Sequence, residues 1–251
     1  MMTILYHWEP SGDSLKMIIA LAEKNVPFES HYVDLLDLEH YGEAFSAVAD
    51  YNRVPLLIDK NEPLKDSQFA LQYLAEAYSP RLAPDDPAGW YDVQAWTAQL
   101  DQVLAPSVRM LGWHTVTSPA MSDDERADFL ARSEGVPKPQ VMAGWAQVTS
   151  DAEASEDQLA NARERIGQVV DRIEAAMERS AWIVGDAYSI VDINAFARIH
   201  TLPRLTPELV NHEHTPRIMA WLERIRQRPS VQEALAMRRS PLGEDVYAPM
   251  V

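Results

Sequence analysis

Cysteine is missing from the chain altogether. Without it, disulfide frameworks, thiolate metal sites and a protein thiol acting as nucleophile are all excluded. Long apolar runs are missing too, since no stretch approaches the roughly 18 residues of a membrane span, and the start MMTILYHWEP lacks the basic and apolar regions of a signal peptide. We therefore expect a cytoplasmic protein that does not insert into a membrane.

Positive charge is scarce. The chain has 22 lysine and arginine residues against 38 aspartate and glutamate residues, a formal charge of -16. Binding to nucleic acid or to an anionic membrane requires a cationic face, so neither partner is expected. An anionic ligand must be held by local donors instead.

The rest of the composition is that of an ordinary globular protein, with 47% hydrophobic and 24% charged residues. A length of 251 residues is enough for one large or two modest domains, and we expect two.

The first third of the chain predicts a small sheet covered by helices. Residues 3–8 are strand-like, and apolar residues then recur at helical spacing from Leu15 to Ala22. Two further strand patterns occupy residues 28–34 and 54–59, and a short third segment precedes a helix with its apolar face at 70–77. The order strand, helix, strand, then strand, strand, helix is typical of an α/β domain.

A break in composition separates this region from the rest. Three prolines and a glycine lie within residues 79–89, and polar residues dominate there. Beyond the break every strong pattern has helical period, including the long apolar face from Leu159 to Met177. We predict domains at 1–80 and 88–251, the second all-α, with a less regular stretch at 112–156 that shapes a site.

The segment from Pro10 to Lys16 joins the first strand to a helix. Unpaired N–H groups and the positive end of the helix dipole favour a bound anion there. A serine hydroxyl, from Ser11 or Ser14, can stabilise a ligand thiolate by donating a hydrogen bond to it. The alternative is that Ser11 or Asp13 only caps the helix.

Two further segments can likewise have either a ligand-binding role or a purely structural one. Pro55 follows Val54 at the start of a strand and is a candidate cis proline, which would turn the preceding backbone toward a ligand. Asp66 and Ser67 precede a helix, where they can hold an ammonium and a carboxylate group respectively, or serve as a plain helix cap.

Other polar residues are expected to stabilise the fold and not to take part in chemistry. Ser189 and Asp192 form a capping box at a helix start, with Tyr188 placed to pack on Ile193. The histidines lack acidic or cysteine partners at ligand spacing, so no metal site is expected. Tryptophans Trp8, Trp113 and Trp145 fit either a helix core or an aromatic acceptor pocket.

Taken in order, these segments resemble the glutathione transferase family almost from end to end. The matching segments are LYHWEPSGDSLKMIIALAEKNVPFE, RVPLLID, KDSQFALQYL, WIVGDAYSIVDI and TPRIMAWLERIRQRPSV. The resemblance implies a thioredoxin-like α/β domain followed by an all-α domain, glutathione as co-substrate and a homodimer. Three cues resemble one branch, the bacterial β-etherases that cleave β-aryl ethers of lignin-derived phenylpropanoids: EPSGDSLK, MLGWH and SDDERADFLARSEGVPKPQVMAGW.

The resemblance also implies roles for individual residues. Val54 would pair its backbone with the cysteinyl part of glutathione beside cis Pro55, while Asp66 and Ser67 would hold the γ-glutamyl end. Ser14 is the first choice for the hydroxyl that contacts sulfur, and Ser11 the second. The remaining positions are Arg53 and His40, each placed to meet a glutathione carboxylate, and Trp8, Trp113, His114 and Trp145, expected around the acceptor.

The chain departs from the family pattern at two places. Ala49 and Asp50 stand where Asn-Pro is frequent, so that loop is expected to differ. Asp13 brings a negative charge near the thiolate and would oppose its ionisation, unless its carboxylate points away or accepts a hydrogen bond from the helix. The absence of cysteine argues against the thiol-transferase-like members.

The reaction that we predict is displacement of a phenolate from a β-aryl ether by the glutathione thiolate, giving a thioether. Two other enzyme activities remain open: conjugation of electrophiles, and isomerisation of a maleyl-type diacid, which would need cationic groups in the acceptor site. A non-catalytic binding module with the same fold is the third alternative.

Overall fold

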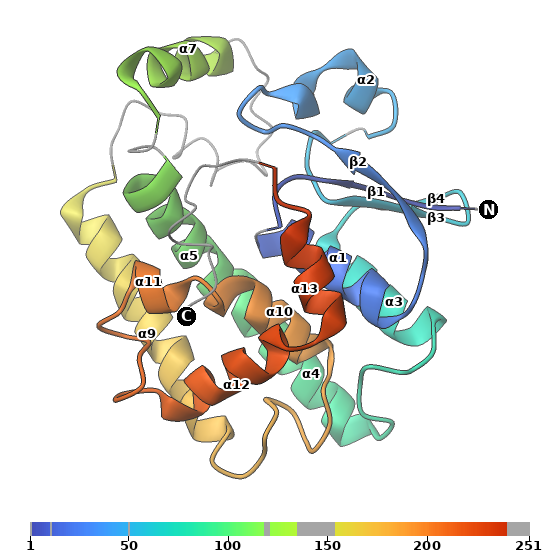
Figure 1. Ribbon diagram of the computed structural model, residues 1–251, viewed down its shortest axis with the longest axis vertical. Coiled ribbons are helices and arrows are strands. Elements are labelled where there is room, and N and C mark those ends of the chain that lie inside the picture. Colours follow the sequence, from blue (N-terminus) through green and yellow to red (C-terminus); the bar gives the residue numbers. More distant parts are fainter. Residues whose placement is uncertain (1, 11, 50, 118–120, 135–153, 240–251) are drawn as a thin grey trace.

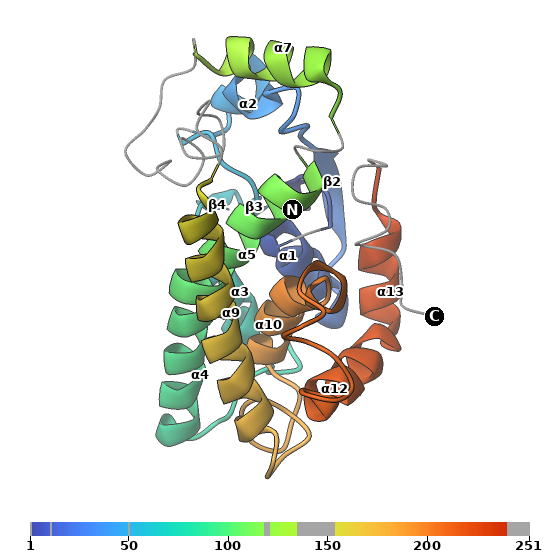
Figure 2. The same cartoon turned by 90° about the vertical axis from the view of Figure 1, so that its left-hand side faces the viewer.

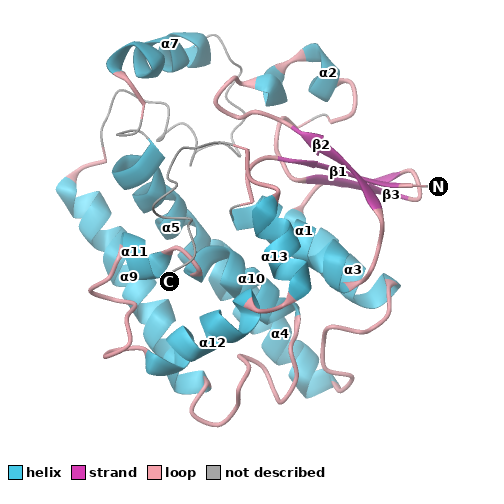
Figure 3. Ribbon diagram, viewed as in Figure 1, coloured by secondary structure: helices cyan, strands magenta, loops and turns pink. Residues whose placement is uncertain are grey.

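The computed structural model describes residues 2–10, 12–49, 51–117, 121–134 and 154–239. A sheet with helices on both of its faces lies at one end, and a larger body of helices fills the other (Figures 1 and 3). The first part contains β1 (Thr3–His7), α1 (Gly12–Glu23), β2 (Phe28–Tyr32), η1 (Glu39–Tyr41), α2 (Glu43–Ser46), β3 (Leu56–Asp59), β4 (Glu62–Leu64) and α3 (Ser67–Ala77). The second contains α4 (Pro87–Gln99), η2 (Leu100–Leu104), α5 (Ala105–Gly112), η3 (Trp113–Thr117), α7 (Asp123–Glu134), α9 (Glu156–Ala176), α10 (Ile190–Ile199), α11 (Leu202–Leu205), α12 (Pro216–Arg226) and α13 (Pro229–Ala236).

The sheet has the strand order β2-β1-β3-β4. β1 pairs in parallel with β2, as the intervening helix α1 requires, and antiparallel with β3. β3 and β4 form a hairpin in which Lys60 and Asn61 both have positive φ, the conformation of the two-residue turns that match strand twist. The predicted order of strands and helices in this region is confirmed.

Side-chain alternation along the strands supplies a core on each face of the sheet. Leu5 and Leu57 join the main core beneath α1 and α3, whereas Val33 and Leu56 pack with Phe45 of α2 on the opposite face. The main core continues without a break into α4, α9, α10 and α12. One apolar core therefore extends through both halves of the chain, and the smaller cluster on the opposite face of the sheet belongs to the first half alone.

Helix α10 runs through the centre of the helical half, and all ten of its residues are buried. Its start is the predicted capping box, in which Ser189 N–H donates to Asp192 Oδ2 at 3.0 Å and Val191 N–H donates to Ser189 Oγ at 3.2 Å. Asp192 Oδ1 also accepts from Trp221 Nε1 at 3.0 Å. The box thus fixes both the helix start and the packing of α12 against it.

The chain stays helical from α4 to η3, but in two stretches, η2 and η3, the helical turns are wider than those of an α-helix. Pro106 accounts for the first, because it has no N–H and its ring would clash with the carbonyl four residues earlier in a regular helix. In η2 the N–H of Ala105 bonds instead to the carbonyl of Leu100, five residues back, and the turn widens. This wide turn carries Asp101, which belongs to the site described next.

Candidate active site

Ser14 lies in the first turn of α1, directly after the loop that leaves β1, and is 5% exposed. Its Oγ accepts the backbone N–H of Trp8 at 3.2 Å. This contact uses a lone pair, so the hydroxyl hydrogen remains available to donate to a ligand atom at the helix N-terminus. The other serine candidate, Ser11, lies outside the described residues.

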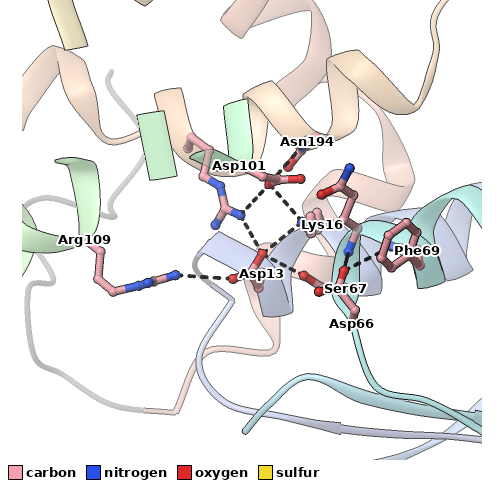
Figure 4. A network of polar contacts seen from close by, with 10 residues as sticks. Asp13, Lys16, Asp66, Ser67, Phe69, Asp101, Arg109 and Asn194 are labelled. Carbon is pink, nitrogen blue, oxygen red and sulfur yellow. Dashed lines mark hydrogen bonds and ion pairs between the residues drawn. The ribbon is translucent and has the colours of Figure 1, made fainter. Parts of the chain in front are cut away.

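Asp13 is the centre of a polar network at the same end of α1 (Figure 4). Its Oδ1 contacts Arg198 Nη2 at 2.5 Å, Lys16 Nζ at 2.9 Å and the donating hydroxyl of Ser67 at 2.9 Å. Its Oδ2 lies 3.5 Å from Arg109 Nη2. Burial opposes ionisation of this carboxyl, but the charges of Arg198, Lys16 and Arg109 outweigh it and hold the pKa of Asp13 well below its usual range.

Asp101 is the second carboxylate of the network. Its Oδ1 lies 3.2 Å from both Lys16 Nζ and Arg198 Nη2, and it accepts from Asn194 Nδ2 at 3.3 Å. Lys16 is 0% exposed and Arg198 5% exposed, so these cations are held away from water by their carboxylate partners. The network joins α1, η2 and α10, which belong to both halves of the chain.

The charge balance of this network changes the meaning of Asp13. Three cations, Lys16, Arg109 and Arg198, face the two carboxylates, so the cluster carries one positive charge in excess. From the sequence, the negative charge of Asp13 was expected to oppose ionisation of a ligand thiol. In the structure the surrounding cations more than balance this charge, so the opposition is removed. In a chain of formal charge -16, this is a local source of cationic donors.

The two residues at the start of α3 have different partners. Asp66 Oδ1 accepts the N–H groups of Gln68 at 2.8 Å and Phe69 at 3.2 Å, which is the helix cap that the sequence offered as the alternative. Ser67 instead turns its hydroxyl to Asp13. Ser67 therefore lies beside the charged network. The roles of Asp66 and Ser67 in binding a ligand remain predictions.

The Val54–Pro55 peptide bond is cis, as predicted. Val54 is half-buried, Pro55 is buried at the start of β3, and the side chain of Arg53 is exposed. His40, on η1, is buried against Tyr41, and burial lowers its pKa to about 4. At neutral pH His40 is uncharged, so any contact with a carboxylate would be a neutral hydrogen bond and not an ion pair.

The buried histidines give a prediction for acid stability. Burial lowers the pKa of both His40 and His200 to about 4 from 6.5, so the unfolded chain binds more protons below pH 6.5 and the free energy of unfolding falls as the pH drops toward 4. Each histidine contributes a loss of about 3 kcal/mol, at about 1.4 kcal/mol per unit of pKa. Asp192 acts oppositely, because burial raises its pKa to about 6.

Urea unfolding between pH 7 and 4.5 measures this dependence. In the variant His200→Gln we expect the slope to decrease by about 1 kcal/mol per pH unit. An unchanged slope in that variant contradicts the assignment.

The aromatic candidates come from different segments of the chain. Trp8, half-buried, follows β1 and bonds Ser14 through its backbone, while Trp113 and His114 are half-buried on η3. Trp113 packs on Phe129 of α7, with ring centroids 5.6 Å apart. Trp145 lies outside the described residues.

Helix α7 links the aromatic side of the site to the sheet half. Arg132 donates from Nη2 to the carbonyl of Leu36 at 3.3 Å and lies 3.8 Å from Asp37, both in the loop before η1. Figures 1 and 2 both place α7 and α2 at the same end of the molecule. Together with the Trp113–Phe129 contact, these interactions make α7 a connection between η3 and the sheet half.

Sequence reasoning missed four residues of the network: Lys16, Asp101, Arg109 and Arg198. Each is one charged residue within a helical pattern, and Asp13 is separated from Arg198 by 185 positions. They lie on α1, η2, α5 and α10, and only the packing of these four elements brings them together. No spacing signal in the sequence marks them.

Among the described residues, no group of three or more potential ligands is placed to hold a metal ion, and no helix there is long and apolar enough to cross a membrane.

Comparison with known proteins defines the class. Residues 5–82 match the model of the glutathione S-transferase N-terminal domain, and residues 137–229 match that of the C-terminal domain. The chain therefore belongs to the glutathione S-transferase family, and the predicted fold of a thioredoxin-like domain followed by helices is confirmed.

Individual relatives narrow the comparison. Protein LigF of Sphingobium sp. (strain NBRC 103272 / SYK-6) is 28% identical over 238 residues, covering 91% of each chain. The crystal structure of the β-etherase LigF from that strain superposes with a TM-score of 0.83 at 27% identity, covering 94% of this chain and 100% of the other. A glutathione transferase from Burkholderia graminis, crystallised with two glutathione molecules per subunit, has a TM-score of 0.72 at 23% identity, covering 96% of this chain and 88% of its own.

Proposed function

We propose that this protein is a glutathione-dependent β-etherase acting on aryl ethers of lignin-derived phenylpropanoids, with residues 1–80 holding glutathione and residues 88–251 supplying the acceptor site. The glutathione sulfur donates an electron pair to the carbon that bears the aryl ether, a C–S bond forms, and the C–O bond breaks. Its electron pair leaves with the phenolate, which takes up a proton from water. No change of oxidation state and no further reactant is required.

The geometry supports the thiolate part of this reaction. Ser14 offers a hydroxyl hydrogen at the N-terminus of α1, where the helix dipole favours an anion. The adjacent network adds one positive charge in excess, which also favours the ionised sulfur. More thiolate at neutral pH means more nucleophile.

The choice of an aryl ether as acceptor is carried by one observation, the match over nearly the whole chain to the β-etherase LigF. The half-buried Trp113 on η3 supports it, because an aromatic side chain suits a phenylpropanoid ring. Arg109, four residues before Trp113, is the feature that favours the diacid isomerase as second candidate, since a diacid needs a cation.

A fluorescence assay separates these activities. The protein is incubated with glutathione and a β-aryl ether that releases a fluorescent phenol, each enantiomer separately, and with a maleyl-type diacid in parallel. Glutathione-dependent release of phenol from one enantiomer is the expected result. Turnover of the diacid without release from either enantiomer would assign the second activity.

We also propose a homodimer, which the family resemblance implies. Phe69 on α3 and Tyr91 on α4 are 65% and 72% exposed, unusually high for large aromatic residues. The two helices touch through Gln72 Nε2, which donates to Gln94 Oε1 at 3.1 Å, each one turn beyond an exposed aromatic residue. This face is our candidate for contact with a second copy of the chain.

Sedimentation velocity tests the dimer. The native chain is expected to sediment as a dimer, and the double variant Phe69→Glu, Tyr91→Glu as a monomer, because burying two carboxylates in an apolar contact is costly. The matched control is Glu76→Gln, an exposed change on the same helix α3. A double variant that remains dimeric places the interface elsewhere.

A further inference from the structure

The loop that leaves β1 is anchored on both sides of the residue that contacts Ser14. Trp8 donates its backbone N–H to Ser14 Oγ at 3.2 Å, so the position of this N–H sets the direction in which the hydroxyl can donate. The neighbours of Trp8 in the chain are His7, 1% exposed, and Glu9, 8% exposed. The contacts that hold these two buried polar side chains therefore also fix the backbone between them.

His7 holds the carbonyl of Trp8. Its Nδ1 lies 2.5 Å from that carbonyl oxygen, and its Nε2 lies 2.7 Å from Ser30 Oγ on β2. Burial lowers the pKa of His7, so its ring is neutral at neutral pH. A carbonyl can only accept, so Nδ1 carries the hydrogen and Nε2 accepts from the Ser30 hydroxyl. The Trp8 backbone is thus joined through His7 to the neighbouring strand.

Glu9 ties the next residue of the loop to two other segments. Tyr32, also on β2, donates its hydroxyl to Glu9 Oε1, and the backbone N–H of Arg239 donates to Oε2 at 3.0 Å. The guanidinium of Arg239 lies over the ring of Tyr32, 4.5 Å from its centroid. Burial and the adjacent carboxylate raise the pKa of Tyr32, so its hydroxyl remains a donor. Each oxygen of Glu9 therefore accepts from a different part of the chain.

The second of these donors comes from the helical half, because Arg239 follows α13. Helix α13 packs against α1, and its other end is tied to the same unit: Arg228 donates from Nε and Nη2 to Glu23, at the end of α1, at 2.6 and 2.7 Å. Figures 1 and 2 show α13 beside α1. One carboxylate at each end therefore joins α13 and the segment after it to the strand and helix that flank the sulfur loop.

We propose that Glu9 is a positioning residue: it holds the Trp8 backbone, and through it the Ser14 hydroxyl, in the orientation that donates to the glutathione thiolate. The segment after α13 supplies part of this support. The inference rests on the thiolate contact of the proposed function, but not on the acceptor. The helical half then contributes to formation of the thiolate without touching the sulfur.

The charge of Glu9 and its positioning role act on the thiol in opposite directions. A negative charge in this loop opposes ionisation, so loss of the charge alone would lower the thiol pKa. Loss of the support for Trp8 and Ser14 would raise it, because a misdirected hydroxyl no longer stabilises the thiolate. The direction of the shift therefore distinguishes the two effects.

Ultraviolet titration of the bound glutathione thiol tests the proposal. We expect Glu9→Ala to raise the thiol pKa by up to about one unit, which is up to about a tenfold loss of thiolate. Glu9→Gln should stay near the native value, because its amide oxygen can accept from the Arg239 N–H and its NH₂ group can donate to the Tyr32 hydroxyl. The double variant Glu9→Ala, Ser14→Ala should have the thiol pKa of Ser14→Ala, because both changes act through one hydroxyl.

Glu23→Ala is the matched control. Its side chain is 9% exposed and likewise joins α1 to α13, but it lies at the far end of α1 from Ser14. This variant should be less stable than the native protein and leave the thiol pKa unchanged. If Glu9→Ala does not fold, Tyr32→Phe decides the question: it removes one donor to Glu9, keeps the ring, and should raise the thiol pKa by a smaller amount.

A thiol pKa that is lower or unchanged in Glu9→Ala, or unchanged in Tyr32→Phe where that variant decides, would overturn the proposal. So would an equal rise in Glu23→Ala, or a double variant whose thiol pKa exceeds that of Ser14→Ala. A native protein that does not lower the thiol pKa of glutathione would refute the proposed function, and this inference with it. A lowered native value that Glu9→Ala retains refutes this inference alone.

Discussion

Replacing Ser14 by alanine is expected to raise the pKa of the bound glutathione thiol and to lower kcat/KM at neutral pH by about 10- to 100-fold. The hydroxyl lies at the N-terminus of α1, and its oxygen is held by the Trp8 N–H at 3.2 Å. Its hydrogen can donate to a thiolate but gains less from a neutral thiol, so the ionised form is preferentially stabilised. Ultraviolet absorbance of the bound thiolate across pH measures the shift directly.

The control for this experiment is Ser107→Ala. Ser107 is 4% exposed, similar to Ser14, but its hydroxyl donates to the Val103 carbonyl of its own helical run at 2.9 Å. We expect its rate and thiol pKa to stay near those of the native protein. Ser11→Ala is measured beside it, and a loss confined to that variant would transfer the role to Ser11. Unchanged rates in both serine variants would refute a serine role altogether.

Replacing Asp192 by asparagine is expected to cost about 3 kcal/mol of unfolding free energy, because buried donors lose their acceptor. Oδ1 accepts from Ile183 N and Trp221 Nε1, and Oδ2 accepts from the N–H and the hydroxyl of Ser189. An amide has one oxygen, so its NH₂ group must face one of these donor pairs. Urea unfolding at pH 7 measures the loss.

The same measurement on Asp186→Asn provides the comparison, because Asp186 is exposed in the loop just before the capping box. Its unfolding free energy should stay within about 0.5 kcal/mol of the native value. If both variants lose the same amount, the cost comes from the change of charge in this region and not from the buried box.

Much of the fold was predictable from local patterns. The strands, the long apolar face of α9 and the capping box each depend on residues close together in sequence, and the structure confirms them. The order of these elements also indicated the family. The shared core between the two halves was not predictable, because an apolar helix face does not specify its partner.

The site was predictable only in part. Ser14, Pro55 and Ser67 stand in short segments with a recognisable setting, whereas Lys16 looks like an ordinary solvent-facing residue in the sequence of α1. It is buried because α1 packs against α3, α10 and α13. The wide turn η2, induced before Pro106, then presents Asp101 to this lysine.

Asp13 shows why such residues matter for interpretation. Judged from its neighbours in sequence, its charge opposes a thiolate. In the structure Arg198 and Lys16 neutralise it from two different helices, and the balance becomes positive. The sign of the local field depends on contacts separated by up to 185 positions, which sequence spacing does not reveal.

The products of the reaction test displacement by the glutathione thiolate most directly. The protein is incubated with glutathione and a β-aryl ether in water enriched in oxygen-18, and the products are analysed by mass spectrometry. Displacement by the thiolate predicts one glutathione thioether for each phenol released, with no heavy oxygen at the attacked carbon. Release of phenol with heavy oxygen at that carbon and without the thioether would contradict it, as would no release at all.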